Sequence, residues 1–200
     1  MYTTTIGAPP AVVLVPKNRG LAAMAEYALR ESSLSGALYE RTVVRGEDVP
    51  LLASEVARSG RAVLAFTGED LVQEWIAGGR RLDPRLSQRS IAWNDPQARY
   101  GKPALCFIAA RGTALPANGI QRVAVCAKYA NLAGTFLATL ERPGLTFEPI
   151  PISGSVEAAL LHSLADFMID IVVTGTTIDD LGLEVKAVIT TSDLAVLEAR

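Results

Sequence analysis

Short apolar runs alternate along this chain with longer segments in which apolar residues recur every three to four positions. This alternation is typical of strand–helix–strand units that pack helices against largely parallel sheets. Strands are predicted at residues 11–15, 62–66, 104–109, 122–126, 145–152, 167–173 and 183–189. Helices are predicted at about residues 21–28, 49–59, 132–140, 156–164 and 192–198, with a further helix starting at residue 69. The pattern therefore predicts an α/β fold.

One stretch of the chain interrupts the alternation. Residues 77–102 contain two adjacent glycines, two prolines and five arginines, a composition typical of irregular connections. We interpret this stretch as the boundary between two α/β lobes. The tail from residue 183 onward is expected to add one strand and a short helix, which return to the first lobe.

Composition and charge then narrow the possible functions. Half of the 200 residues are hydrophobic and a fifth are charged, which is typical of a folded globular protein. A net charge of −2 gives no general attraction to nucleic acid or to an anionic membrane, so an anion requires a local site. The first apolar run is too short to cross a bilayer, and no signal-peptide pattern precedes it. We expect a cytoplasmic protein with neither nucleic acid nor membrane as a partner.

The cysteines and the single histidine give little sign of chemistry. Cys106 and Cys126 each lie inside an apolar run, where buried free thiols are common and metal binding is not indicated. His162 is the only histidine, so a Ser/His triad could form only through it. Its position between two leucines favours a partly buried residue of a helix. No metal ligands are identified.

The strongest candidate site follows the predicted strand that ends at residue 173. In open α/β sheets, ligands bind at the carboxyl ends of the strands, and here the strand runs directly into Thr174-Gly175-Thr176-Thr177. Gly175 permits positive φ and close approach of the backbone, while N–H groups and threonine hydroxyls can converge on one anion. The loop suits a monophosphate, and no Walker-type glycine-lysine motif is present. The alternative is a turn that only caps a helix.

Two further loops carry charged residues at similar positions. Lys17 and Arg19 follow the first predicted strand and could neutralise phosphates, although a solvated basic turn has the same composition. Glu157 lies at the start of a predicted helix and is a candidate catalytic carboxylate. Its surroundings are also explained by capping alone, with Ser153 or Ser155 as the cap and Glu157 in the first turn.

The order and spacing of these loops resemble the ATP phosphoribosyltransferase family over nearly the whole chain. The last loop is the most telling, because family members carry Asp-x-Val-x-x-Gly-x-Thr-Leu at their phosphoribosyl pyrophosphate site. Residues 170–178 match that motif apart from the closing leucine. The other similar segments are Val15-Pro16-Lys17-Asn18-Arg19, Asp48-Val49-Pro50, Gly68-Glu69-Asp70-Leu71, Ala127-Lys128-Tyr129-Ala130-Asn131-Leu132, Ser153-Gly154-Ser155-Val156-Glu157 and Leu164-Ala165-Asp166.

The resemblance implies an activity and roles for the candidate residues. Phosphoribose would pass from phosphoribosyl pyrophosphate to N1 of the ATP adenine, releasing pyrophosphate with Mg²⁺ bound to it. Lys17 and Arg19 would stabilise the departing phosphates. The phosphoribosyl pyrophosphate site would comprise Asp170, Val173, Thr174, Gly175, Thr176 and Thr177.

The resemblance also implies an architecture and partners. Family members fold into two lobes like type II periplasmic binding proteins, with the active site in the cleft. Residues 1–98 with 181–200 would form lobe I, and residues 99–180 would form lobe II with the phosphate loop. A C-terminal regulatory domain is not expected. A short-form member would be a homo-oligomer that depends on a separate subunit resembling histidyl-tRNA synthetase.

Several positions depart from the family pattern near the expected second substrate. Asn18 replaces a glycine, Ala62 stands where an acidic residue is usual, and Gly134 stands where an arginine is usual. Two other functions therefore stay open. One is a paralogous phosphoribosyltransferase that uses another base, and the other is a non-catalytic two-lobed ligand-binding or regulatory subunit.

Overall fold

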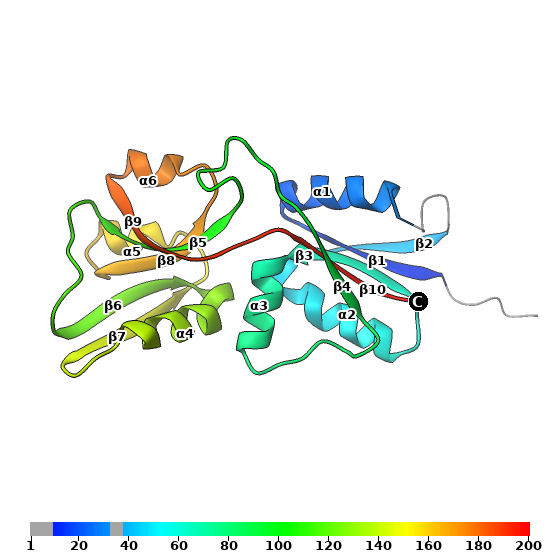
Figure 1. Ribbon diagram of the computed structural model, residues 1–200, viewed down its shortest axis with the longest axis horizontal. Helices are drawn as coiled ribbons and strands as arrows, with labels where there is room; N and C mark the ends of the chain where they lie inside the picture. Colours follow the sequence, from blue (N-terminus) through cyan, green and yellow to red (C-terminus); the bar gives the residue numbers. More distant parts are fainter. Residues whose placement is uncertain (1–9, 33–37) are drawn as a thin grey trace, which may run out of the picture. The chain divides into compact units, whose positions relative to one another are not determined.

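The chain divides into two compact units, each built around a five-stranded sheet (Figure 1). The computed structural model describes residues 10–32 and 38–200. The first unit contains the described part of Met1–Gly68, with Arg81–Ile91 and Leu194–Arg200. The second unit contains Glu69–Arg80 and Ala92–Asp193. The chain thus crosses between the units four times.

The first unit packs helices on both faces of its sheet. Its strands, in spatial order, are β2 (Tyr39–Val44), β1 (Ala11–Pro16), β3 (Val63–Gly68), β10 (Leu194–Ala199) and β4 (Ser87–Ile91). Its helices are α1 (Arg19–Arg30), η1 (Gly46–Asp48) and α2 (Val49–Arg58). Side chains alternate between the faces of a strand, so Val13 and Val15 pack with α1 whereas Val12 and Leu14 pack with α2.

The second unit has the same arrangement of parallel strands. Its strands, in spatial order, are β7 (Leu145–Ile152), β6 (Gly119–Cys126), β8 (Phe167–Val172), β5 (Ala104–Ala110) and β9 (Leu183–Thr191). Its helices are α3 (Glu69–Ala77), η2 (Ala127–Tyr129), α4 (Ala130–Leu140), α5 (Glu157–Leu161) and α6 (Thr176–Asp180). One face buries a cluster that contains Phe107 and Phe167, stacked 4.8 Å apart, beneath α3 and α4. The opposite face packs against α5 and α6.

The directions of the strands show where their carboxyl ends lie, which is where α/β sheets bind ligands. In each sheet the first three strands in spatial order are parallel, and the other two run antiparallel to their neighbours. β6 lies between β7 and β8, so the chain reverses its direction of travel across the sheet after β7. Such a reversal leaves a crevice at the carboxyl ends of β6 and β8. The predicted α/β class and two-lobed organisation are confirmed.

The tail differs from the sequence-based prediction. Residues 194–199 form β10 and not a helix, because this apolar run is buried between β3 and β4 in the interior of a sheet. An apolar run of six residues fits either structure, and the tertiary surroundings decide. Residues 183–191 pair with β5 in the second unit, so only the end of the tail rejoins the first unit.

Two strands carry no apolar run that could predict them. β2 and β4 lie at opposite edges of the first sheet, and most of their side chains are exposed. An edge strand with exposed side chains shows neither a buried run nor strict alternation. The irregular stretch predicted at residues 77–102 therefore contains a short strand.

No helix in the described part of the chain is long and apolar enough to span a bilayer.

Candidate functional site

The candidate phosphate loop leaves β8 and turns tightly into α6. Gly175 has φ of +83°, a conformation that residues with a Cβ atom rarely adopt. The Oγ1 atoms of Thr174 and Thr176 lie 3.0 Å apart, and the N–H of Thr176 donates to Thr174 Oγ1 at 3.4 Å. The predicted need for glycine at this position is thus explained by the turn itself.

Several backbone donors of this loop remain available to a ligand. The N–H groups of Gly175, Thr177 and Ile178 have no acceptor anywhere in residues 10–32 and 38–200. Backbone N–H groups presented together by a glycine turn form a concave site that favours anions. The side chains of Thr174, Thr176 and Thr177 are exposed and add hydroxyl groups to the same loop. The geometry suits a compact anion such as a monophosphate.

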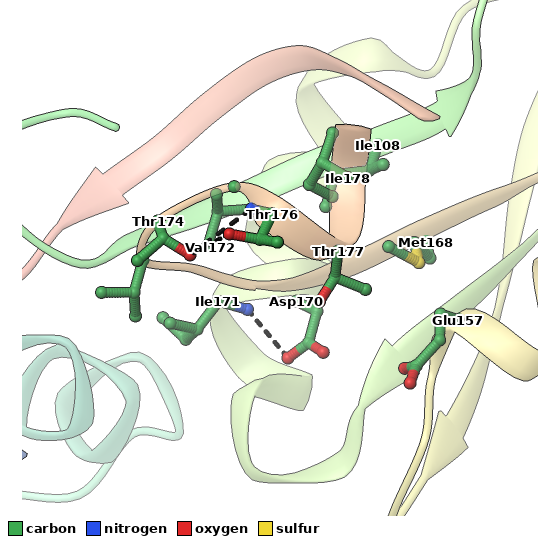
Figure 2. A pocket seen from close by; sticks show the side chains of 12 residues that line it. Ile108, Glu157, Met168, Asp170, Ile171, Val172, Thr174, Thr176, Thr177 and Ile178 are labelled. Atoms are coloured by element: carbon green, nitrogen blue, oxygen red, sulfur yellow. Dashed lines mark hydrogen bonds between the residues drawn. The ribbon is translucent and has the colours of Figure 1, made fainter. Parts of the chain in front are cut away.

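A pocket of about 320 Å³ lies against the loop and is lined by residues of the second unit alone. Figure 2 shows the carboxylates of Asp170 and Glu157 below the loop, with Thr177 above Asp170. The predicted site residues that the structure brings together in this pocket are Glu157, Asp170, Val173, Thr174, Gly175, Thr176 and Thr177. The remaining wall is apolar and includes Ile108, Met168 and Ile178.

Asp170 combines a hydrogen bond with a partly buried position. One carboxylate oxygen accepts the N–H of Ile171 at 2.8 Å. Burial raises the pKa of Asp170 above its ordinary value, and the charge of Glu157 adds to this effect. The Ile171 N–H and the charge of Lys128 oppose it without reversing it. Asp170 is therefore a carboxylate held close to the loop at some expense in stability.

Replacing Asp170 with asparagine is expected to stabilise the protein at pH 7. Because the folded state binds the Asp170 proton more tightly than the unfolded chain does, stability falls as pH rises from the ordinary carboxyl range through the raised pKa. The introduced amide has no proton to lose, and its oxygen can still accept the Ile171 N–H. Urea unfolding measures the free energy of unfolding of Asp170→Asn and of the wild type. The two proteins should differ at pH 7 but not at about pH 3, where free carboxyls are protonated. Asp180→Asn corrects for the change in net charge, and a less stable Asp170→Asn at pH 7 would contradict the expectation.

The basic residues predicted for the site belong to the first unit. Lys17 is exposed and follows β1, and Arg19 is the exposed first residue of α1. Between them, Asn18 caps α1, since its side-chain oxygen accepts the N–H of Leu21 at 3.2 Å. The asparagine that replaces the family glycine therefore has a local structural role. The predicted roles of Lys17 and Arg19 stay predictions.

The third predicted loop differs in its detail. α5 begins at Glu157, and the side chains of Ser153 and Ser155 form no capping hydrogen bond to it. The helix ends at Leu161, so His162 is exposed at its C-terminal cap and not partly buried within it. Glu157 occupies the first turn and faces the pocket (Figure 2).

Both cysteines are free thiols in or beside apolar clusters, as predicted. Burial raises the pKa of the Cys106 thiol to about 12, which makes it a poor nucleophile. Burial also raises the pKa of Cys126. No group of three or more His, Cys, Asp or Glu side chains in the described ranges could hold a metal ion.

Arg99 is a residue beside the loop that the sequence did not single out. It is one of five arginines in the stretch predicted to be irregular, and neither spacing nor motif distinguishes it from the others. Its backbone N–H nevertheless donates to the carbonyl of Val173 at 2.7 Å. Only the folded chain brings residues so distant in sequence together.

Comparison with known proteins identifies a family. The ATP phosphoribosyltransferase (HisG) family matches residues 45–200, which include every residue that lines the pocket. This chain belongs to that family. The ATP phosphoribosyltransferase of Pseudomonas paraeruginosa is 32% identical over 149 residues, 74% of this chain and 60% of the relative. That of Dictyoglomus thermophilum is 34% identical over 161 residues, 80% of this chain and 67% of the relative. The chain thus spans about three fifths of the length of most of the relatives it matches.

Solved structures support the fold. The ATP phosphoribosyl transferase (HisG:HisZ) complex from Thermotoga maritima is similar with a TM-score of 0.69 and 21% identity, covering 96% of this chain and 88% of that chain. The periplasmic aliphatic sulphonate binding protein SsuA from Escherichia coli gives 0.56 and 15%, covering 96% and 62%. The expected resemblance to periplasmic binding proteins is confirmed for this ATP phosphoribosyltransferase family member.

Proposed function

We propose that this chain transfers phosphoribose from phosphoribosyl pyrophosphate to N1 of the ATP adenine, with release of pyrophosphate. The observation that carries the proposal is the loop at Thr174–Thr177, where three hydroxyls and three N–H groups without an acceptor in the described chain surround one glycine turn. Membership of the ATP phosphoribosyltransferase family supplies the reaction. In this reaction the loop binds the 5′-phosphate of the sugar.

The proposed mechanism depends mainly on positioning and charge. Loss of pyrophosphate develops positive charge at the anomeric carbon of the ribose, and fixed charges around that carbon and the departing phosphates lower the barrier. The loop fixes one end of the phosphoribosyl group, while Asp170 lies beneath it to contact the ribose or orient the loop. Glu157 is the second carboxylate of the pocket and is available to the developing cation. Lys17 and Arg19 are proposed to contact the pyrophosphate.

Mg²⁺ is proposed to enter with phosphoribosyl pyrophosphate, where it would offset the charge of the leaving pyrophosphate. The residues of the pocket fit an ion carried in this way. Magnesium in phosphate-transferring sites commonly uses one or two protein carboxylates together with substrate oxygens. Asp170 and Glu157 line the pocket, and the described chain holds no larger cluster of ligands.

The proposal extends to partners and location. The Thermotoga maritima neighbour is a complex of HisG with HisZ. By analogy with that complex, we propose that this chain is a short-form catalytic subunit that works with a separate subunit. We further propose that the chain forms a homo-oligomer and that the partner subunit resembles histidyl-tRNA synthetase. We place it in the cytoplasm, where ATP and phosphoribosyl pyrophosphate are available.

An activity assay tests the reaction. Incubation with ATP, phosphoribosyl pyrophosphate and Mg²⁺, with and without the proposed partner subunit, should produce the absorbance of phosphoribosyl-ATP. Turnover with another base but not with ATP would select the paralogous enzyme. Binding of phosphoribosyl pyrophosphate without turnover of any base would select the non-catalytic subunit.

Removing both hydroxyls of the loop tests the phosphate site. Thr176→Ala combined with Thr177→Ala is expected to weaken binding of phosphoribosyl pyrophosphate about 30-fold, or roughly 1 kcal/mol for each hydroxyl. Calorimetry measures the dissociation constant directly. Thr135→Ala combined with Thr139→Ala is a matched control, because these exposed threonines of α4 bond only to carbonyls of their own helix. Equal binding by the loop variant and the wild type would refute the site.

A further inference from the structure

Arg99 contacts the phosphate loop at both of its ends. Its backbone N–H donates to the carbonyl of Val173, the residue that leads into the loop, at 2.7 Å. Its guanidinium Nη1 lies 3.1 Å and 3.2 Å from the two carboxylate oxygens of Asp179 in α6. One residue of a distant segment therefore joins the strand before the loop to the helix after it.

The Arg99 side chain also packs directly against Gly175. A Cβ atom at position 175 would lie 2.9 Å from Arg99 Nη1 and 3.0 Å from Arg99 Cδ. The first distance is shorter than real Cβ contacts and the second is tight, so a side chain at position 175 would require the arginine to shift. The turn and the guanidinium are thus fitted to each other.

The charged end of Arg99 lies against Gly175, the central residue of the loop. Its hydrogen bond to Asp179 raises the pKa of Arg99 further above its ordinary value, so the guanidinium is charged throughout the physiological range. The ion pair itself is exposed and contributes little to stability, since solvent screens such pairs. The pair nevertheless orients the guanidinium, which lies against Gly175.

We propose that Arg99 is a positioning residue for phosphate recognition, holding the loop around Gly175 in its binding conformation and placing a positive charge beside it. This inference rests on the proposed function, because it assumes that the loop binds the 5′-phosphate. Asp179 acts with Arg99 by fixing the guanidinium. A loop already held in shape loses less conformational entropy when the ligand binds.

The first test replaces Arg99 with methionine, which keeps much of the apolar side chain and removes the charge. We expect binding of phosphoribosyl pyrophosphate and of ribose 5-phosphate to weaken about tenfold. In the full reaction, the KM for phosphoribosyl pyrophosphate should rise while the KM for ATP stays unchanged. Arg142→Met is the matched control, because Arg142 is an exposed arginine of the same unit that bonds the Pro116 carbonyl at 2.9 Å.

The second test separates positioning from direct contact with the ligand. If Asp179 fixes Arg99, Asp179→Asn weakens ribose 5-phosphate binding about threefold, and the double variant binds no worse than Arg99→Met alone. If Asp179 instead competes with the phosphate for Arg99, Asp179→Asn tightens binding of ribose 5-phosphate. That result overturns the proposal. Unchanged binding in Arg99→Met, with normal binding by the wild type, also overturns it. A wild-type protein that binds neither ligand refutes the proposed function instead.

Discussion

Gly175→Ala is expected to weaken binding of phosphoribosyl pyrophosphate by about 100-fold, or roughly 3 kcal/mol. Two penalties combine at this position. The positive φ of 83° disfavours any residue with a Cβ atom, and that atom would force the Arg99 side chain to move from its place beside the loop. The variant can relieve both penalties by opening the loop, which separates the N–H groups that converge on the phosphate. Binding must then close the loop against the full strain.

Calorimetry with phosphoribosyl pyrophosphate measures this effect, and Gly182→Ala is its control. Gly182 follows the same short helix with φ of +64°, but nothing lies within 4 Å of its Cβ position. Gly182→Ala therefore introduces the same kind of backbone strain as Gly175→Ala. It brings no contact with Arg99, and Gly182 does not line the pocket. It should lose some stability and keep its affinity. Equal losses of affinity in both variants would show that Gly175 has no particular role in binding.

Glu74→Ala is expected to destabilise the second unit by about 3 kcal/mol, because it leaves three partly buried donors without their acceptor. Glu74 lies on α3 with only 7% of its surface exposed. Its carboxylate accepts the N–H groups of Asn131 and Leu132 at 2.9 Å and 2.8 Å, and the Asn131 side chain at 2.6 Å. These two N–H groups are in the first turn of α4, where the helix supplies no acceptor of its own.

Urea unfolding followed by circular dichroism measures the loss. Gln73→Ala is the matched control on the same helix, since Gln73 is exposed and accepts only the Thr190 hydroxyl. We expect its effect to stay within about 0.5 kcal/mol. A Glu74→Ala protein as stable as the Gln73→Ala protein would mean that water replaces the carboxylate at the start of α4.

The sequence predicted the buried strands and the phosphate loop because both have local causes. β3, β5 and β8 are apolar runs bounded by turn residues, and Gly175 is required by the backbone of its own turn. The other segments that are similar to the family follow the family's order along the chain, and this order strengthened the prediction of the phosphate loop. A feature is readable from sequence when its physical cause lies within a few residues of it.

Features with distant causes were missed or misassigned. β10 is a strand because β3 and β4 flank it, and β4 is a strand because β10 pairs with it. Arg99 resembles its neighbouring arginines until the fold brings it against Gly175. The segments around Asp70 and Tyr129 are similar to the family, but the sequence alone gave no physical reason for that similarity. In the structure, Tyr129 donates a short hydrogen bond to Asp70, which Ser192 also contacts at 2.6 Å.

The interior position of β10 has a consequence for the order in which the protein can fold during synthesis. β4 pairs with β10 and with no other described strand of its sheet. After β4 is made, the ribosome must add the whole of Ala92–Asp193 before β10 emerges. The second unit can therefore reach its native contacts while the first still exposes the edge of β3. Chaperones that bind nascent chains would therefore encounter the first unit, most of which is synthesised earlier, while its sheet still lacks β10.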